Sequence, residues 1–167
     1  MNSSLIRSNI IRFIVFVLIQ GVVLKGVNIP NIDILLYPLF VLMLPLGMAD
    51  GLLLLACFAI GMSVDAFYGT MGLHASGALF MGGIRKFVLA FLEPRGGYDA
   101  GKALTKANFG VAWFIKYAGI LLFLHTFWVS LLEYLQFSWL LGVRIIVVFA
   151  ISLLLAVVYQ FIFNPKE

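Results

Sequence analysis

Six long hydrophobic segments dominate this sequence and constrain its fold more than any other feature. They cover roughly residues 10–24, 34–49, 51–66, 73–92, 111–135 and 141–163. A helix rises 1.5 Å per residue, so about 20 residues cross the hydrocarbon of a bilayer. Because 63% of the residues are hydrophobic and only 11% are charged, too few polar side chains exist to cover a water-soluble globule. The sequence therefore predicts a single all-α integral membrane domain over residues 1–167, with six transmembrane helices.

The positive charges predict how these helices are oriented. With a cytoplasmic N-terminus and six crossings, nine of the 11 Lys and Arg residues fall on the cytoplasmic side. Both termini and the connection over residues 93–109 are therefore expected in the cytoplasm, in a multi-pass protein. The formal charge of +4 does not indicate nucleic-acid binding, because the basic residues form no stripe with interleaved aromatic residues. The expected surroundings are the lipid bilayer.

The stretch GMSVDAFYGTMGLHASG, at residues 61–77, places polar side chains where polarity is costly. Asp65 and His74 flank the predicted turn between the third and fourth helices, on the outer side. One interpretation is interfacial capping, in which Asp65 ends one helix and a threonine opens the next. In the other, Gly69 and Gly72 let the backbone fold back tightly, and the carboxylate caps freed N–H groups or binds a partner.

Three further polar residues lie inside hydrophobic segments. His125 is expected to form a hydrogen bond to a neighbouring helix, and the alternative is a proton relay through Glu133. Gln20 and Gln160 are expected to form interhelical hydrogen bonds. With only two histidines and no nucleophile–base pair or carboxylate dyad, the sequence predicts no metal site, no cofactor and no enzymatic activity.

Small residues recur at helical spacing in the fourth segment, at Ala75, Ala78 and Gly82. Small side chains three or four residues apart allow two helices to approach closely. They are interpreted as packing within this protein, with a docking face for another protein's helix as the alternative.

Proline and arginine mark two irregular points. Pro38 and Pro45 lie in the predicted helix over residues 34–49, where each removes a backbone N–H. They predict kinks, which either shape a cavity or only bend the helix. Arg85 and Lys86 lie deep in the fourth segment. The sequence leaves three readings of these two residues open. In the first, the helix ends near Gly83 and the chain continues as an amphipathic helix at the interface. In the second, the two side chains snorkel to the surface, and in the third they line a cytoplasmic groove.

Taken together, these features resemble the MreD family of rod shape-determining membrane proteins. The resemblance covers nearly the whole chain. It rests on Gln20 in the first helix, on the second helix bracketed by Pro38 and Pro45, and on two longer stretches. These are GxxxDxFxGTxGLHA at residues 61–75 and EPRGGYD at residues 93–99.

The resemblance implies a fold like that of the substrate-binding subunits of energy-coupling-factor transporters, in the bacterial inner membrane. It implies a non-enzymatic scaffold that supports lateral peptidoglycan synthesis and cell shape. The implied partners are an MreC-like membrane protein, RodA, a class B penicillin-binding transpeptidase and the MreB cytoskeleton. No catalytic residues carry over, and the motif positions Asp65, Gly69, Gly72, Leu73 and His74 are the best functional candidates.

Two other functions remain open at this stage. The shared fold raises the possibility of a vitamin-binding transporter subunit, although the first helix lacks the small-xxx-small pattern that docks the energising module in those proteins. Gly21 and Gly26 are five residues apart. The third possibility is a lipid-processing enzyme that uses Asp65, His74 or His125 as an acid or a base.

Overall fold

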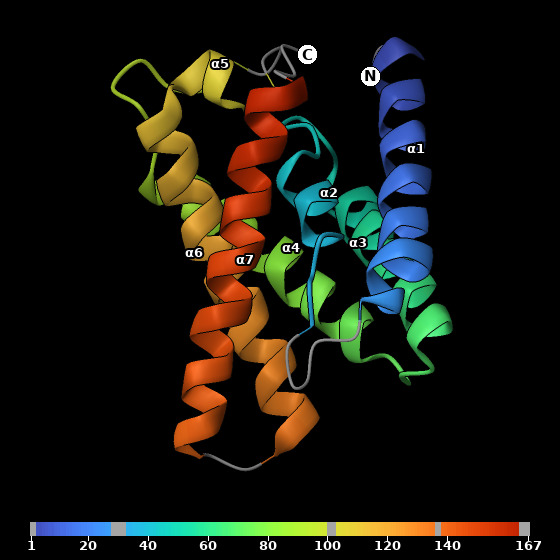
Figure 1. The fold of residues 1–167 in the computed structure, drawn as a ribbon. Coiled ribbons are helices and arrows are strands. Elements are labelled where there is room, and N and C mark those ends of the chain that lie inside the picture. Colours follow the sequence, from blue (N-terminus) through green and yellow to red (C-terminus); the bar gives the residue numbers. More distant parts are fainter. Residues whose placement is uncertain (1–2, 28–32, 100–102, 136–137, 164–167) are drawn as a thin grey trace.

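The computed structural model describes residues 3–27, 33–99, 103–135 and 138–163, and within these residues the protein is all-α with no strand (Figure 1). The elements in chain order are α1 (Ser3–Leu18), a π-helix η1 (Ile19–Val23), a 3-10 helix η2 (Leu24–Gly26), α2 (Pro38–Leu42), α3 (Asp50–Tyr68), α4 (Leu73–Phe91), α5 (Lys106–Phe109), α6 (Val111–Tyr134) and α7 (Trp139–Phe163).

Four helical stretches are long and apolar enough to cross a membrane. They are Ile6–Gly26, Asp50–Tyr68, Val111–Tyr134 and Trp139–Phe163. These stretches agree with four of the predicted segments and indicate a multi-pass membrane protein. The fourth predicted segment is also a continuous helix, α4, but it carries two adjacent basic residues.

The prediction of a helix over residues 34–49 is wrong. Only Pro38–Leu42 is helical, and the residues on both sides are irregular. Pro38 occupies the first helical turn, where a missing N–H is tolerated. Pro45 lies beyond the end of α2, and the residue before a proline is disfavoured in the helical region. Neither proline therefore kinks a helix, and the two instead bracket one short helix.

This irregular segment lies inside the molecule. Every residue from position 37 to position 44 is buried. Non-helical backbone at membrane depth is tolerated only where protein covers it or where it lines a water-filled cavity. The segment therefore requires side chains from other elements to satisfy its N–H and C=O groups, and Gln20 and Arg85 supply them.

The predicted fourth segment, residues 73–92, agrees with helix α4, so of the three readings for Arg85 and Lys86 the one that ends the helix near Gly83 is wrong. Helix α4 runs without a break to Phe91. The Arg85 side chain does not reach the surface either, because only 2% of the residue is exposed. Lys86, in contrast, is exposed.

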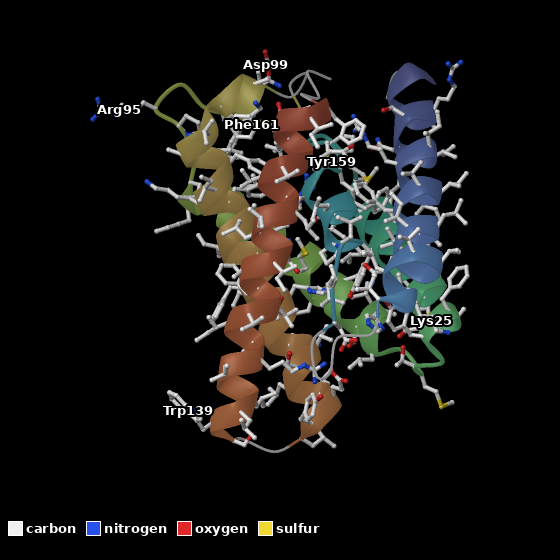
Figure 2. All side chains as sticks on the ribbon, viewed as in Figure 1. Lys25, Arg95, Asp99, Trp139, Tyr159 and Phe161 are labelled. Carbon is white, nitrogen blue, oxygen red and sulfur yellow. The ribbon has the colours of Figure 1, made fainter. Side chains whose placement is uncertain are left out.

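The two ends of the bundle differ in what they carry. The start of α1, the short helix α5 and the end of α7 lie at one end, called the α5 end here (Figure 1). The turn between α3 and α4, the end of α6 and the start of α7 lie toward the other end, which we call the corner end because the chain reverses there between α3 and α4. Figure 2 shows Arg95 and Asp99 at the α5 end, and Lys25 and Trp139 toward the corner end.

Helix α4 packs closely against α3 through small residues. A Cβ added to Gly61 of α3 would lie 2.3 Å from the Cα atom of Ala75, and one added to Gly82 would lie 2.6 Å from the Cys57 Sγ atom. Ala78, which lies between Ala75 and Gly82 on α4, is fully buried. The small residues of α4 therefore serve helix packing within this protein.

Candidate functional site

Asp65 holds the beginning of helix α4 from the neighbouring helix α3. Its Oδ1 atom accepts a hydrogen bond from the backbone N–H of His74 at 3.0 Å, and its Oδ2 atom accepts one from Ala75 at 2.9 Å. The first N–H groups of a helix have no partner within the helix. The residue that precedes α4, Gly72, has no side chain to supply one. The carboxylate of Asp65 therefore acts as the cap of α4 across the turn.

Two more polar groups converge on the same carboxylate. The Thr70 hydroxyl donates to Oδ1 of Asp65 at 2.5 Å. The His74 Nδ1 atom lies 3.0 Å from both Oδ1 of Asp65 and Oγ1 of Thr70. Because an ionised carboxylate only accepts hydrogen bonds, this geometry requires the proton of His74 on Nδ1. We call Asp65, Gly69, Thr70, Gly72 and His74 the corner.

The two corner glycines have backbone conformations that favour glycine. Gly69 has φ of 73° and Gly72 has φ of 84°. The N–H of Gly69 donates to the Asp65 carbonyl at 2.8 Å and ends α3. Helix α4 then begins at Leu73. This geometry agrees with the second interpretation of the sequence, a tight backbone reversal at the two glycines with a carboxylate that caps freed N–H groups.

His125 on α6 is bonded to the segment before α2. Its Nε2 atom lies 2.6 Å from the Tyr37 hydroxyl, and both residues are fully buried. The Tyr37 ring also lies edge-on to His74, with 5.6 Å between the centroids. The Glu133 carboxylate pairs with Arg144 at 3.1 Å. The hydrogen bond of His125 to Tyr37 agrees with the first interpretation, and the relay through Glu133 stays a prediction.

Gln20 uses its whole side-chain amide on other segments. Its Nε2 donates to the Ile34 carbonyl at 2.9 Å and to the Tyr68 hydroxyl at 2.8 Å. Its Oε1 accepts from the N–H groups of Leu36 at 2.7 Å and Tyr37 at 3.2 Å. Gln20 lies in the π-helix η1, a helix type that is frequent at functional positions. Here it satisfies the irregular backbone that precedes α2.

Gln160 contacts the α5 end rather than the corner. Its Oε1 atom accepts from the backbone N–H of Lys106 at 3.3 Å, which links α7 to α5. Its Nε2 atom is buried and has no hydrogen-bond partner within the described chain. Gln160 therefore holds α5 against α7 and takes no part in the hydrogen bonds of the corner described above.

Arg85 is the residue that sequence reasoning left unassigned. Its guanidinium donates to the Leu44 carbonyl, to the Pro45 carbonyl at 3.5 Å and to the Tyr117 hydroxyl at 2.9 Å. The Tyr117 hydroxyl in turn donates to the Leu42 carbonyl at 3.1 Å. These carbonyls belong to the end of α2 and the residues after it, so Arg85 satisfies the backbone where α2 stops.

A small cavity lies beside the corner. It has a volume of about 90 Å³, and its lining includes Thr70, Leu73, His74, Ser130 and Arg144. Arg144 forms ion pairs with Asp33 at 2.5 Å and with Glu133 at 3.1 Å. Pockets for drug-sized ligands are about 300–1,000 Å³. This cavity is therefore smaller than a pocket for a drug-sized ligand.

The corner has the chemistry of a structural cap. The carboxylate of Asp65 already accepts two backbone N–H groups and one hydroxyl, and its oxygens are buried. Across the part of the chain that the structure describes, no three His, Cys, Asp or Glu side chains lie close enough to hold a metal ion.

No family model, no curated protein and no solved structure matches this chain.

Proposed function

We propose that this protein is a non-enzymatic membrane scaffold of the MreD type, which supports lateral cell-wall synthesis in a bacterial inner membrane. Its work is to bind other membrane proteins in one arrangement, with an MreC-like protein as the first partner. RodA, a class B penicillin-binding transpeptidase and the MreB cytoskeleton belong to the same assembly. In this proposal both termini and the α5 end face the cytoplasm.

The observation that carries the proposal is the corner. The motif at residues 61–75 forms one interlocked unit, in which Gly61 contacts Ala75, Asp65 caps α4 and two glycines reverse the chain. The side chains that would be candidates for chemistry are bonded to one another. A rigid corner of this kind supports a function of holding helix faces in place, rather than one of turning over a substrate.

The finer fold is part of the proposal. Helices α3, α4, α6 and α7, the stretch from α1 to η2, and the buried segment around α2 make up six crossings. We propose that this arrangement is the fold of the substrate-binding subunits of energy-coupling-factor transporters, as the resemblance to the MreD family implies. The vitamin-binding alternative has no specific observation in its favour. The cavity beside the corner, at about 90 Å³, is smaller than a pocket for a drug-sized ligand, and the larger grooves of about 460 and 500 Å³ are more open to the surroundings.

Large apolar side chains face outward along α1 and α7 and supply surfaces for partners. On α1, Ile10, Ile11 and Ile14 are each about half exposed. On α7, Ile146 and Leu154 are more exposed still. Inside a membrane such surfaces contact lipid or the helices of other proteins, which is the way a scaffold would act.

The test is co-purification combined with cell shape. The tagged chain, extracted in mild detergent, is expected to retain an MreC-like protein. Asp65→Ala and His74→Ala are expected to disturb rod shape more than Gln160→Ala, because Gln160 lies outside the corner. Membrane abundance of each variant is measured in parallel, so that loss of folding is separated from loss of partner binding.

Two results would contradict the proposal. One is a wild-type chain that purifies without any membrane partner from cells that contain an MreC-like protein. The other is a set of equal, negligible shape changes for all three variants at wild-type abundance.

A further inference from the structure

A second polar site lies between α3 and α4, toward the end of this helical hairpin that is opposite the turn. A groove of about 130 Å³ is lined there by Arg85, Lys86 and Asp50 together with Gly83. The rest of the lining is mainly apolar, and consists of Leu46, Met48, Leu53, Leu54 and Leu89. The groove therefore combines a charged side with apolar walls.

The charged side of this groove is positive. Arg85 is almost fully buried and donates only to neutral acceptors, and it belongs to none of the ion pairs found among the described residues. Lys86 lies 3.6 Å from Asp50, and both side chains are largely exposed. Two cations thus face one carboxylate. A buried charge without a counter-ion is costly, so an anion in the groove would be stabilised.

The start of helix α3 adds to the same potential. Asp50 is its first residue, and no side chain caps the N-terminus within the described chain. The N-terminus of a helix carries partial positive charge and free N–H groups, which favour phosphate and other anions. This feature supports the site that Arg85 and Lys86 form and is secondary to them.

An apolar groove adjoins the charged one. It lies between α1, α2 and α3, with a volume of about 460 Å³, and its lining includes Phe13, Phe40 and Leu55. Met48 lines both grooves, so they meet at this residue. Their junction places a positive site next to an apolar groove on the surface that lipid would contact.

From this junction we infer that the protein binds one anionic phospholipid. Its phosphate lies between Arg85 and Lys86, and one acyl chain follows the apolar groove past Met48. The charged groove is too small for more than the phosphate and its nearest atoms. This inference does not depend on the proposed scaffold function.

Native mass spectrometry of the full chain in detergent tests this directly. We expect phosphatidylglycerol to bind more tightly than phosphatidylcholine, whose headgroup carries no net charge. Lys86→Gln is expected to lower phosphatidylglycerol affinity about fivefold, since one basic residue near an anionic headgroup contributes about 1 kcal/mol. Asp50→Asn is expected to raise it, because the competing carboxylate is removed.

The matched charge control is Lys116→Gln. Lys116 is an exposed lysine of α6 and lines neither groove. We expect this variant to bind phosphatidylglycerol as the wild type does. An equal loss in Lys116→Gln and Lys86→Gln would overturn the inference, because it would show attraction to net charge alone.

A steric test uses Gly83. A Cβ added there meets no atom within 4 Å, and Gly83 lines the groove, so we expect the longer side chain of Gly83→Leu to occupy part of it. We expect it to abolish selective phosphatidylglycerol binding while thermal unfolding stays at or above the wild-type temperature. Gly119→Leu is the control, because a Cβ added to Gly119 also meets no atom within 4 Å and Gly119 lies outside the groove.

Inorganic phosphate separates the lipid from a free anion. We expect millimolar inorganic phosphate to leave phosphatidylglycerol binding intact, because the apolar groove contributes to binding. Complete displacement by phosphate would overturn the assignment to a lipid. Equal affinity for the two lipids, or unchanged binding in Gly83→Leu, would overturn the site itself.

Discussion

The corner and the Arg85 region use buried polar groups in opposite ways. At the corner, one carboxylate accepts hydrogen bonds from backbone N–H groups at the start of a helix. In the Arg85 region, one guanidinium donates to backbone carbonyls at the end of a helix. The corner is closed by its own side chains, whereas the Arg85 region keeps an excess positive charge next to an open groove.

The difference separates two uses of polarity within a membrane protein. A carboxylate that accepts several hydrogen bonds from its own chain fixes the chain and has less capacity left for a ligand. A cation that faces only neutral dipoles also fixes the chain, but it continues to attract anions. The corner therefore has a structural role. The Arg85 region has a structural role as well, and its positive charge also attracts anions.

The largest effect is expected at the contact between α3 and α4. Gly61→Val would place its Cβ atom 2.3 Å from the Ala75 backbone, so the helices must separate. We expect a loss of more than about 4 kcal/mol in the free energy of unfolding, which is an exceptional value for one substitution. Thermal unfolding in detergent measures it.

Gly83→Ala is the control at the Arg85 region. Its Cβ atom meets open space, and alanine favours helix over glycine by about 0.5–1 kcal/mol. We expect a small gain in stability. A severe loss in Gly83→Ala, or none in Gly61→Val, would mean that the close approach is not where the structure has it.

Asp65→Ala is expected to have the next largest effect. It leaves the N–H groups of His74 and Ala75 and the Thr70 hydroxyl without an acceptor, and each buried unsatisfied group costs about 1–3 kcal/mol. We expect a loss of about 3–5 kcal/mol. Asp65→Asn keeps one acceptor oxygen and is expected to lose less, which chemical denaturation of the two variants can show.

These two regions also show what the sequence could predict. An aspartate caps helix ends and glycines adopt the backbone conformations of tight turns, so the spacing of Asp65, Gly69 and Gly72 could predict a capped chain reversal. The partners of Arg85 are carbonyls, which every residue carries, and no pattern marks them. Two prolines seven residues apart predicted kinks. The short helix between them depends on Gln20 and Arg85, which lie far away in sequence.

Arg85→Met is expected to cost less than Asp65→Ala. It removes hydrogen bonds to the Leu44 carbonyl and to Tyr117, yet it also removes a buried charge that is costly to desolvate. We expect a loss of about 1–3 kcal/mol. A larger loss than for Asp65→Ala, under the same conditions, would reverse the ranking of the two regions.

The smallest effect is expected for Lys86→Gln in lipid-free detergent. The ion pair of Lys86 with Asp50 is exposed, and such pairs contribute between about 0 and 1 kcal/mol. We expect the unfolding temperature to change little without lipid. With phosphatidylglycerol added, the wild type should be stabilised more than the variant, and equal stabilisation would show that Lys86 has no part in binding.

The orientation of the bundle in the membrane is the central claim, and cysteine accessibility tests it most directly. Met71 at the corner and Gly96 near α5 are both exposed, whereas the single native cysteine, Cys57, is buried, so the wild-type chain is the unlabelled control. A membrane-impermeant maleimide is applied to intact spheroplasts. We predict that Met71→Cys is labelled at once and Gly96→Cys only after lysis. Labelling of Gly96→Cys in intact spheroplasts, with Met71→Cys protected, would contradict the account.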